Sequence, residues 1–127
     1  CITYDFINSK MEYLGGAISP GINMRYWAMF RYTASLPYIT YWNIPSHELI
    51  GQDTYSSLAS GGINGIAGEV NSIINEYKKR FANLKVVVTG GTSPIFVTLL
   101  NCEIFARPYL VLEGLNRILN YHVANQL

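Results

Sequence analysis

The first two dozen residues constrain the fold more strongly than any other stretch of the chain. Residues 2–7 and 11–14 have the apolar and aromatic composition of extended segments, and the polar residues 8–10 between them indicate a turn. Gly15 and Gly16 permit a backbone angle, or a close approach by another group, that a side chain would prevent. The stretch therefore predicts a β-hairpin whose first strand is buried on one face and partly on the other.

A helix is predicted to follow the hairpin, over residues 21–36. Pro20 fixes its own φ angle, Ser19 is placed to cap the helix, and Pro37 ends it because the residue before a proline is displaced from the α region. The helical stripe consists of Ile22, Tyr26, Met29, Phe30 and Thr33. The aromatic residues 37–45 then predict an extended connection packed on the body of the protein.

The middle of the chain predicts a short helical turn and one long helix. Ser46 is expected to cap the short turn, with His47 as a surface side chain and not a metal ligand. Thr54 begins the long helix, over residues 54–82, which Asp53 or Thr54 can cap. Its buried face is expected to consist of Ile63, Ile66, Val70, Ile73, Ile74, Tyr77 and Phe81. Glycines inside this helix indicate the close approach of another backbone, such as a second helix.

The rest of the chain continues the alternation of strands and helices. Residues 86–88 are a β-branched run, typical of a strand buried on both faces. A turn over 89–94, a helix over 95–101, a strand over 103–109 and a helix over 111–123 follow. The last helix is predicted to direct inward Leu112, Leu115, Ile118, Leu119 and Val123, with Gly114 at a tightly packed point. The order β, β, α, linker, α, β, α, β, α indicates an α/β chain with a mixed sheet and flanking helices.

The balance of charged and apolar residues argues against some partners and requires another. A net charge of +1 over 127 residues gives no electrostatic footprint for nucleic acid or membrane, and no apolar run reaches the ~20 residues that span a bilayer. Charged residues make up 13% and apolar residues 50% of the chain, whereas soluble domains have about 25% charged residues. A partner subunit, or a part of the protein that this chain lacks, is therefore expected to cover apolar surface. Cys1 and Cys102 are expected to be free thiols of a cytoplasmic protein.

A glycine turn between a strand and a helix has the geometry of a ligand-binding turn. Thr89, Gly90 and Gly91 lie where backbone N–H groups can meet an anion or a nucleotide, although neither a GxGxxG nor a Walker A motif is present. The same residues also suit a plain tight turn. The sequence contains no Ser-His-Asp set, Cys-His pair or paired carboxylates suited to catalysis. The residues by themselves therefore specify no reaction.

Five short motifs together resemble the C-terminal half of a type III pantothenate kinase. They are Thr3-x-Asp5, YLGGAISPG at residues 13–21, Gly51-x-Asp53-Thr54, Thr89-Gly90-Gly91, and Leu110-x-Leu112-x-Gly114-Leu115-Asn116. The motifs extend over essentially the whole chain in the family's order, and YLGGAISPG is the most specific of them. The resemblance implies that residues 1–127 are the C-terminal actin-like ATPase domain, with the RNase H-like fold of acetate and sugar kinases, Hsp70 and actin.

The same resemblance implies a reaction and its participants. Members of the family transfer the γ-phosphate of ATP to pantothenate, the first step of coenzyme A biosynthesis, and act in the cytoplasm as homodimers. They use Mg²⁺ carried by the nucleotide and a monovalent cation, K⁺ or NH₄⁺. Thr54 matches a threonine that is implied to hydrogen-bond pantothenate, and Thr89, Gly90 and Gly91 match a turn beside the adenine and ribose. No catalytic or metal-binding residue is carried over to this chain.

Three motifs of the family have no counterpart in the chain, and the resemblance implies that they lie upstream of Cys1. They are the N-terminal phosphate loop, Gly-x-Asp-Arg with the general-base aspartate, and Asp-x-Gly-Thr with a cation-binding aspartate. The expectation is a fragment without its N-terminal domain, inactive by itself. Two alternatives stay open: a regulatory or binding relative similar to transcription accessory factors, and a structural module whose glycine turns only pack helices.

Overall fold

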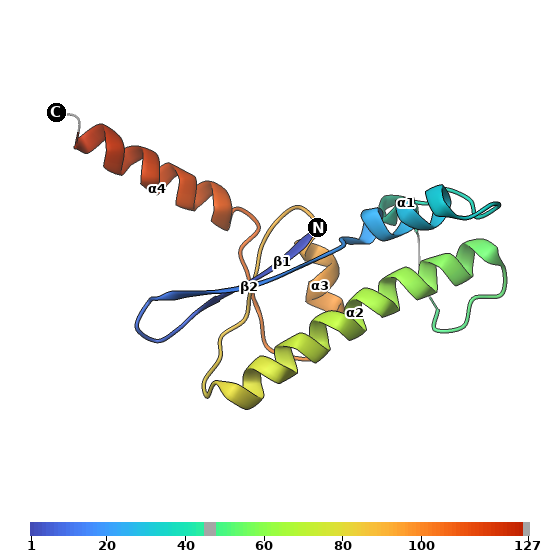
Figure 1. The fold of residues 1–127 in the computed structure, drawn as a ribbon, viewed down its shortest axis with the longest axis horizontal. Coiled ribbons are helices and arrows are strands. Elements are labelled where there is room, and N and C mark those ends of the chain that lie inside the picture. Colours follow the sequence, from blue (N-terminus) through green and yellow to red (C-terminus); the bar gives the residue numbers. More distant parts are fainter. Residues whose placement is uncertain (45–47, 126–127) are drawn as a thin grey trace. The chain divides into compact units, whose positions relative to one another are not determined.

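The structure is a computed structural model and describes residues 1–44 and 48–125. Its elements, in chain order, are β1 (Ile2–Ile7), β2 (Tyr13–Ser19), α1 (Ile22–Tyr32), the 3₁₀ helix η1 (Tyr41–Asn43), α2 (Thr54–Arg80), β3 (Val87–Val88), α3 (Ser93–Leu99), β4 (Phe105–Ala106) and α4 (Leu110–Ala124) (Figure 1). The predicted order of strands and helices is confirmed. The short turn expected at Ser46 and the position of His47 lie outside the described residues.

The chain divides into two compact units, Cys1–Ile66 and Ala67–Leu127, which we call the N-terminal and C-terminal units. In the N-terminal unit β1 and β2 pair antiparallel, and in the C-terminal unit β3 and β4 pair parallel. The α/β class is thus confirmed, but the described strands form two separate two-stranded sheets and not the predicted mixed sheet. No helix within the described part of the chain has the length and apolar content required to cross a bilayer.

The hairpin forms as predicted, but its second strand is longer. The Asn8 Oδ1 accepts hydrogen bonds from the backbone N–H groups of Lys10 and Glu12, both at 2.9 Å, which closes the turn. Met11, expected to be extended, lies in this turn with φ 63°. The strand β2 then runs through both glycines to Ser19. Exposure alternates along β1 between half-buried and exposed residues, so neither the buried first face nor the partly buried second face that the sequence predicted is present.

The two hairpin glycines meet the two needs that the sequence indicated. Gly15 has a φ angle of +93°, a conformation that residues with a side chain rarely adopt. A Cβ atom added at Gly16 would lie 1.4 Å from the carbonyl oxygen of Tyr4 on the facing strand. The first glycine therefore supplies a backbone angle, and the second allows β1 and β2 to come together.

Helix α1 is shorter than predicted, and a glycine occupies its N-cap position. The N-cap residue is Gly21 without a side-chain hydrogen bond, whereas the Ser19 hydroxyl is buried and has no hydrogen-bond partner among the described residues. The predicted cap at Ser19 is therefore wrong. The helix ends four residues early because Thr33 is extended and its hydroxyl donates to the Met29 carbonyl at 2.7 Å. A threonine that bonds the backbone in this way competes with helix continuation.

The core of the N-terminal unit is built where α1 meets α2. Tyr26 is 1% exposed, and its hydroxyl donates a hydrogen bond to the Ala59 carbonyl at 3.1 Å. A Cβ atom at Gly62 would lie 2.3 Å from the Tyr26 ring. The other buried apolar residues of this core are Ile22, Ile39, Leu58, Ile63 and Ile66. The predicted close approach at a helix glycine is confirmed at Gly62, but a tyrosine side chain makes it and not a backbone.

The C-terminal unit has a small core on the second half of α2. Its buried apolar residues are Val70, Ile74, Ile95 and Phe96. The Asn71 side chain donates to the carbonyl of Leu99 at 3.0 Å and accepts from the backbone N–H of Asn101 at 2.8 Å. One amide thus fastens the end of α3 to α2. The sequence gave no indication of this role.

Three predictions for the C-terminal unit are wrong. Val87 in β3 is 48% exposed, so this strand is not buried on both faces. Helix α4 has no buried residue, and the five side chains predicted to face inward are exposed. A Cβ atom at Gly114 would meet nothing within 4 Å, so this glycine is not at a tightly packed point. Periodicity located the apolar face of α4 but could not show what covers it.

Substituting Gly62→Ala should destabilise the N-terminal unit. The new methyl group would collide with the Tyr26 ring, and overpacking of this kind costs about 1–3 kcal/mol. Gly65→Ala in the same helix is the matched control, because its Cβ would meet nothing within 4 Å and alanine favours the helix by roughly 1 kcal/mol. Urea unfolding should lower the midpoint for the first variant and raise it for the second. Equal midpoints would contradict this account of the core.

Tyr26 should make the free energy of unfolding fall as the pH rises in the alkaline range. Burial, with a smaller contribution from Tyr55, raises the pKa of Tyr26 from 10.0 to about 12. Between these values the unfolded chain loses the proton that the folded chain retains, so the free energy of unfolding falls by up to about 1.4 kcal/mol per pH unit. Tyr26→Phe removes this dependence and, near neutral pH, costs about 1 kcal/mol for the lost hydrogen bond. Urea unfolding from pH 9 to 12 should show that the native protein loses its advantage in free energy of unfolding over Tyr26→Phe. A difference that stays constant over this range would disprove the assignment to Tyr26.

Candidate functional site

An open pocket of about 480 Å³ lies over the start of α2 in the N-terminal unit. Its lining residues are Met29, Leu36, Gly51, Gln52, Asp53, Thr54, Ser57, Leu58 and Gly61. Four of them follow one face of α2 because they are spaced three or four residues apart. The hydroxyl groups of Thr54 and Ser57 make no hydrogen bond with any described residue, so both can serve a ligand. Met29, Leu36 and Leu58 give the same pocket an apolar part.

A reciprocal cap fixes the first turn of α2 beneath this pocket. The backbone N–H of Ser56 donates to the Asp53 Oδ1 at 2.7 Å, and the Ser56 Oγ accepts from the backbone N–H groups of Gln52 and Asp53 at 2.9 and 3.0 Å. Of the two predicted caps, Asp53 is the one used, and Thr54 is the first helical residue as predicted. The role of Ser56 was missed, although the Asp-x-x-Ser spacing is a variant of the capping box.

The cap also sets the charge at the pocket. The backbone N–H and the hydroxyl of Ser56 both donate to the Asp53 carboxylate, which lowers the pKa of Asp53 below its ordinary value. The carboxylate is therefore ionised at neutral pH and already occupied by donors from the helix. Thr54, one residue later, keeps its hydroxyl available.

Gly51 allows the preceding loop to close over α2. A Cβ atom at this position would lie 2.3 Å from the backbone nitrogen of Ser57 and 2.4 Å from its Cα. These are backbone atoms of a capped helix and cannot move aside cheaply. The Gly-x-Asp-Thr spacing therefore has a physical explanation: the glycine permits the contact, Asp53 caps the helix, and Thr54 is presented to the pocket.

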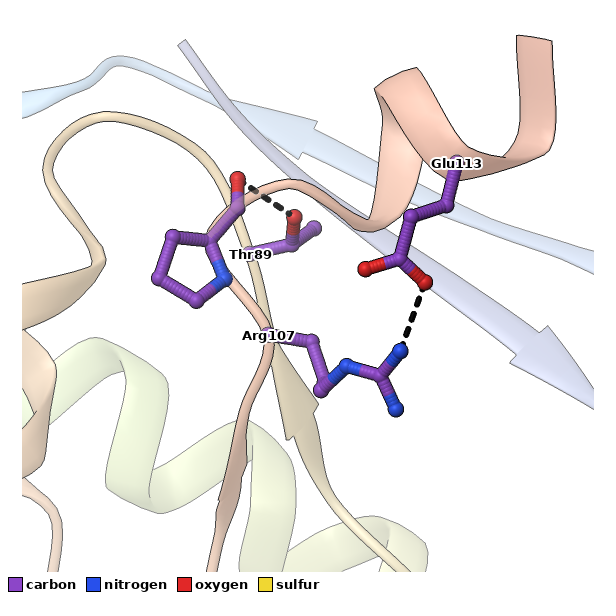
Figure 2. Close-up of polar contacts among 4 residues, drawn as sticks. Thr89, Arg107 and Glu113 are labelled. Carbon is purple, nitrogen blue, oxygen red and sulfur yellow. Dashed lines mark hydrogen bonds and ion pairs between the residues drawn. The ribbon is translucent and has the colours of Figure 1, made fainter. Parts of the chain in front are cut away.

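The second candidate site is the turn after β3 in the C-terminal unit (Figure 2). The Thr89 hydroxyl and the backbone N–H of Gly90 both donate to the carbonyl oxygen of Pro108, each at 3.3 Å. Gly90 has a φ angle of +95°, and a Cβ atom at Gly90 or Gly91 would meet nothing within 4 Å. Hydrogen bonds to the Pro108 carbonyl thus hold the turn, and the space beside its two glycines is open. No sequence signal pointed to Pro108.

An ion pair lies next to this turn and joins β4 to α4. Figure 2 shows Arg107 Nη2 reaching the Glu113 Oε2, at 2.6 Å. The Arg107 backbone N–H also donates to the Val88 carbonyl at 2.9 Å, continuing the ladder beyond β4. Both side chains are about half exposed, so the pair adds little stability. The pair brings the first turn of α4 into contact with the strand that precedes it.

The structure therefore places the sequence-predicted residues in two separate settings. Thr54 lines the pocket of the N-terminal unit. Thr89, Gly90 and Gly91 form the turn of the C-terminal unit. Within residues 1–44 and 48–125, no group of three or more His, Cys, Asp or Glu side chains could hold a metal ion. Both cysteines are free thiols, as predicted.

Comparison with known proteins gives consistent matches. A family model described as type III pantothenate kinase matches residues 1–76. The type III pantothenate kinase of Christiangramia forsetii is 45% identical over 122 residues, which cover 96% of this chain and 49% of the relative. The protein of that name from Flavobacterium johnsoniae is 40% identical over 98% of this chain and 50% of the relative. The one from Cytophaga hutchinsonii is 41% identical over 97% and 52%. The chain spans about half the length of the curated relatives it matches.

Asp53→Ala should lower the thermal midpoint and loosen the pocket, because the cap of α2 is lost. Asp53→Asn should keep the cap at neutral pH, since asparagine accepts the same hydrogen bond. Asp53→Ala removes both the cap and the charge, whereas Asp53→Asn removes only the charge, so comparing them separates the two effects. The folded-state pKa of Asp53 is lowered, so its ionised form stabilises the fold above pH 3.8 and this stabilisation is lost as the pH falls further.

Thermal unfolding from pH 7 to 2 measures both effects. The native protein should lose stability in acid more steeply than Asp53→Asn, which has no proton to bind at this position. If Asp53→Ala and Asp53→Asn unfold at the same temperature near neutral pH, the reciprocal cap does not hold the helix.

Proposed function

The chain belongs to the type III pantothenate kinase family and matches a C-terminal half of its members, and we propose that it is the C-terminal part of an enzyme that phosphorylates pantothenate with ATP. The observation that carries this proposal is the match to kinases so named over 96–98% of the chain. The product would enter coenzyme A biosynthesis in the cytoplasm. The names of these relatives favour a kinase over the regulatory and purely structural alternatives.

The pocket at the start of α2 is the proposed pantothenate contact. Pantothenate carries hydroxyl, amide and carboxylate groups around a compact branched hydrocarbon centre. The free hydroxyl of Thr54 can bond a polar group of this substrate, while Met29 and Leu58 offer apolar contacts for its methyl groups. A few placed polar groups on a largely apolar wall are the usual composition of a small-molecule site.

The turn after β3 is the proposed nucleotide contact, beside the adenine and ribose of ATP. The open space at Gly90 and Gly91 fits this group, because neither glycine has a neighbour within 4 Å of its would-be Cβ. The Thr89 hydroxyl already donates to Pro108, so it would offer the nucleotide its oxygen as an acceptor. When bound, ATP supplies the phosphoryl group that is transferred.

Among the described residues, no group of three or more His, Cys, Asp or Glu side chains could hold a metal ion. We therefore assign no step of the reaction to a metal held by this chain. Phosphoryl transfer depends mainly on positioning and on charge neutralisation. This chain would supply positioning, and the general base and the cation site would come from the rest of a homodimeric enzyme with the RNase H-like fold. The chain by itself should be inactive.

In the complete enzyme, Thr54→Ala should weaken pantothenate binding by roughly tenfold, equivalent to about 1.4 kcal/mol for one lost hydrogen bond. ATP binding should change little. Thr54→Ser keeps the hydroxyl and should retain most of the affinity. Isothermal titration with each ligand separately measures the two constants.

Gly91→Val is the matched test of the other site. Its side chain would enter the open space beside the turn, and Gly91 lacks the positive φ angle that would strain such a variant at Gly90. ATP binding should weaken while pantothenate binding is retained. If Thr54→Ala reduced both affinities equally, the assignment of Thr54 to pantothenate would be wrong.

A further inference from the structure

Helix α4 carries an apolar face that no other element of the C-terminal unit covers. Its members, which we call the α4 face, are Val111, Leu112, Leu115, Ile118, Leu119 and Val123. At about 100° per residue these six side chains fall within an arc of roughly 140°. Each is between 55% and 61% exposed. The polar residues Glu113, Arg117 and Asn120 lie on the other side of the helix, whereas Asn116 borders the α4 face and His122 lies within its arc.

The first turn of α4 contacts the end of β4 through a few polar groups. The pair between Arg107 and Glu113 joins the first turn of the helix to the end of that strand (Figure 2). The carbonyl of Pro108, between the strand and the helix, accepts two hydrogen bonds from the turn after β3. These contacts place the start of α4 beside β4, while the α4 face itself makes no buried contact.

A membrane does not suit this face. Amphipathic helices that lie on anionic bilayers are rich in lysine and arginine along their polar side. Arg117 is the one lysine or arginine of α4, and the negative charge of Glu113 offsets its positive charge. The protein as a whole has a net charge of only +1.

A second copy of α4 is also too small a partner. The helix has 15 residues, which corresponds to a length of about 22 Å and a width of roughly 10 Å. The footprint of such a helix is a few hundred Å², short of the roughly 800 Å² per partner of a stable interface. Pairing of two α4 helices would therefore not by itself hold two chains together.

We propose that the α4 face docks on the part of its own polypeptide that corresponds to the half of the relatives not matched by this chain. The relatives align over 96–98% of this chain but only 49–52% of their own length. An amount of chain equal to the present one is therefore available as the occupant. Docking within one polypeptide also avoids the entropic cost of association between molecules. The inference rests on family membership and not on the assignment of a catalytic role.

The test uses the complete protein. Leu115→Glu and Leu119→Glu place a charge in the α4 face, whereas Asn120→Glu, at the neighbouring residue, adds the same charge on the polar side. Hydrogen exchange followed by mass spectrometry reports the protection of the α4 amides, and analytical ultracentrifugation reports the mass of the assembly. Leu115→Ala is a milder variant, in case a buried charge prevents folding.

In the unsubstituted protein the α4 amides should be protected from exchange. Their protection should not change over roughly a hundredfold dilution, because docking within one polypeptide does not depend on protein concentration, whereas dimerisation does. Charge in the α4 face should speed their exchange by about tenfold or more, with Leu115→Ala intermediate. The mass and the protection of α2 should not change, and Asn120→Glu should match the unsubstituted protein. Free exchange of α4 in the unsubstituted protein would overturn the proposal. So would protection lost on dilution together with the larger mass, which would make a second copy the occupant.

Discussion

The packing of Tyr26 against α2 determines the arrangement of the N-terminal unit. The ring lies over Gly62, where a Cβ atom would come within 2.3 Å of it, and its hydroxyl bonds the Ala59 carbonyl. A large aromatic residue that is 1% exposed needs both a space for the ring and a partner for the hydroxyl. Helix α2 supplies both within a single turn. The contact fixes the distance between α1 and α2, and the residues around it form the core of the unit.

The pocket depends on the same contact. Met29 reaches its wall from α1, one turn beyond Tyr26, while Thr54 and Ser57 reach it from the first turns of α2. Because Tyr26 sets the position of α1, it also sets the distance from the apolar part of the pocket to its hydroxyl groups. The reciprocal bonds of Asp53 and Ser56 then hold the start of α2 in place. A core tyrosine and a helix cap together position Thr54 at the pocket.

Prediction from sequence was most accurate where the signal was local. Thr54 as the first residue of α2, the hairpin and the glycine turn at residues 89–91 follow from turn chemistry and capping, which a few neighbouring residues decide. Prediction was wrong where a side chain could adopt more than one position or hydrogen-bond partner. Ser19 could have capped α1 but is the last residue of β2, with its hydroxyl buried, and Thr33 ended that helix early by bonding Met29. Pro108 and Asn71 were missed because carbonyl and amide partners distant in sequence leave no pattern.

The sequence by itself determined the α/β order, the helix starts and the family, since motifs and periodicity are properties of neighbouring residues. The structure decided which glycine meets a side chain, which hydroxyl stays free, and how the strands pair. Gly62 and Gly65 look alike in the sequence, yet one faces Tyr26 and the other open space. Likewise, the stripe of α4 reads as an inward face but is exposed. Periodicity shows that a face is apolar, whereas only an arrangement in space shows what lies against it.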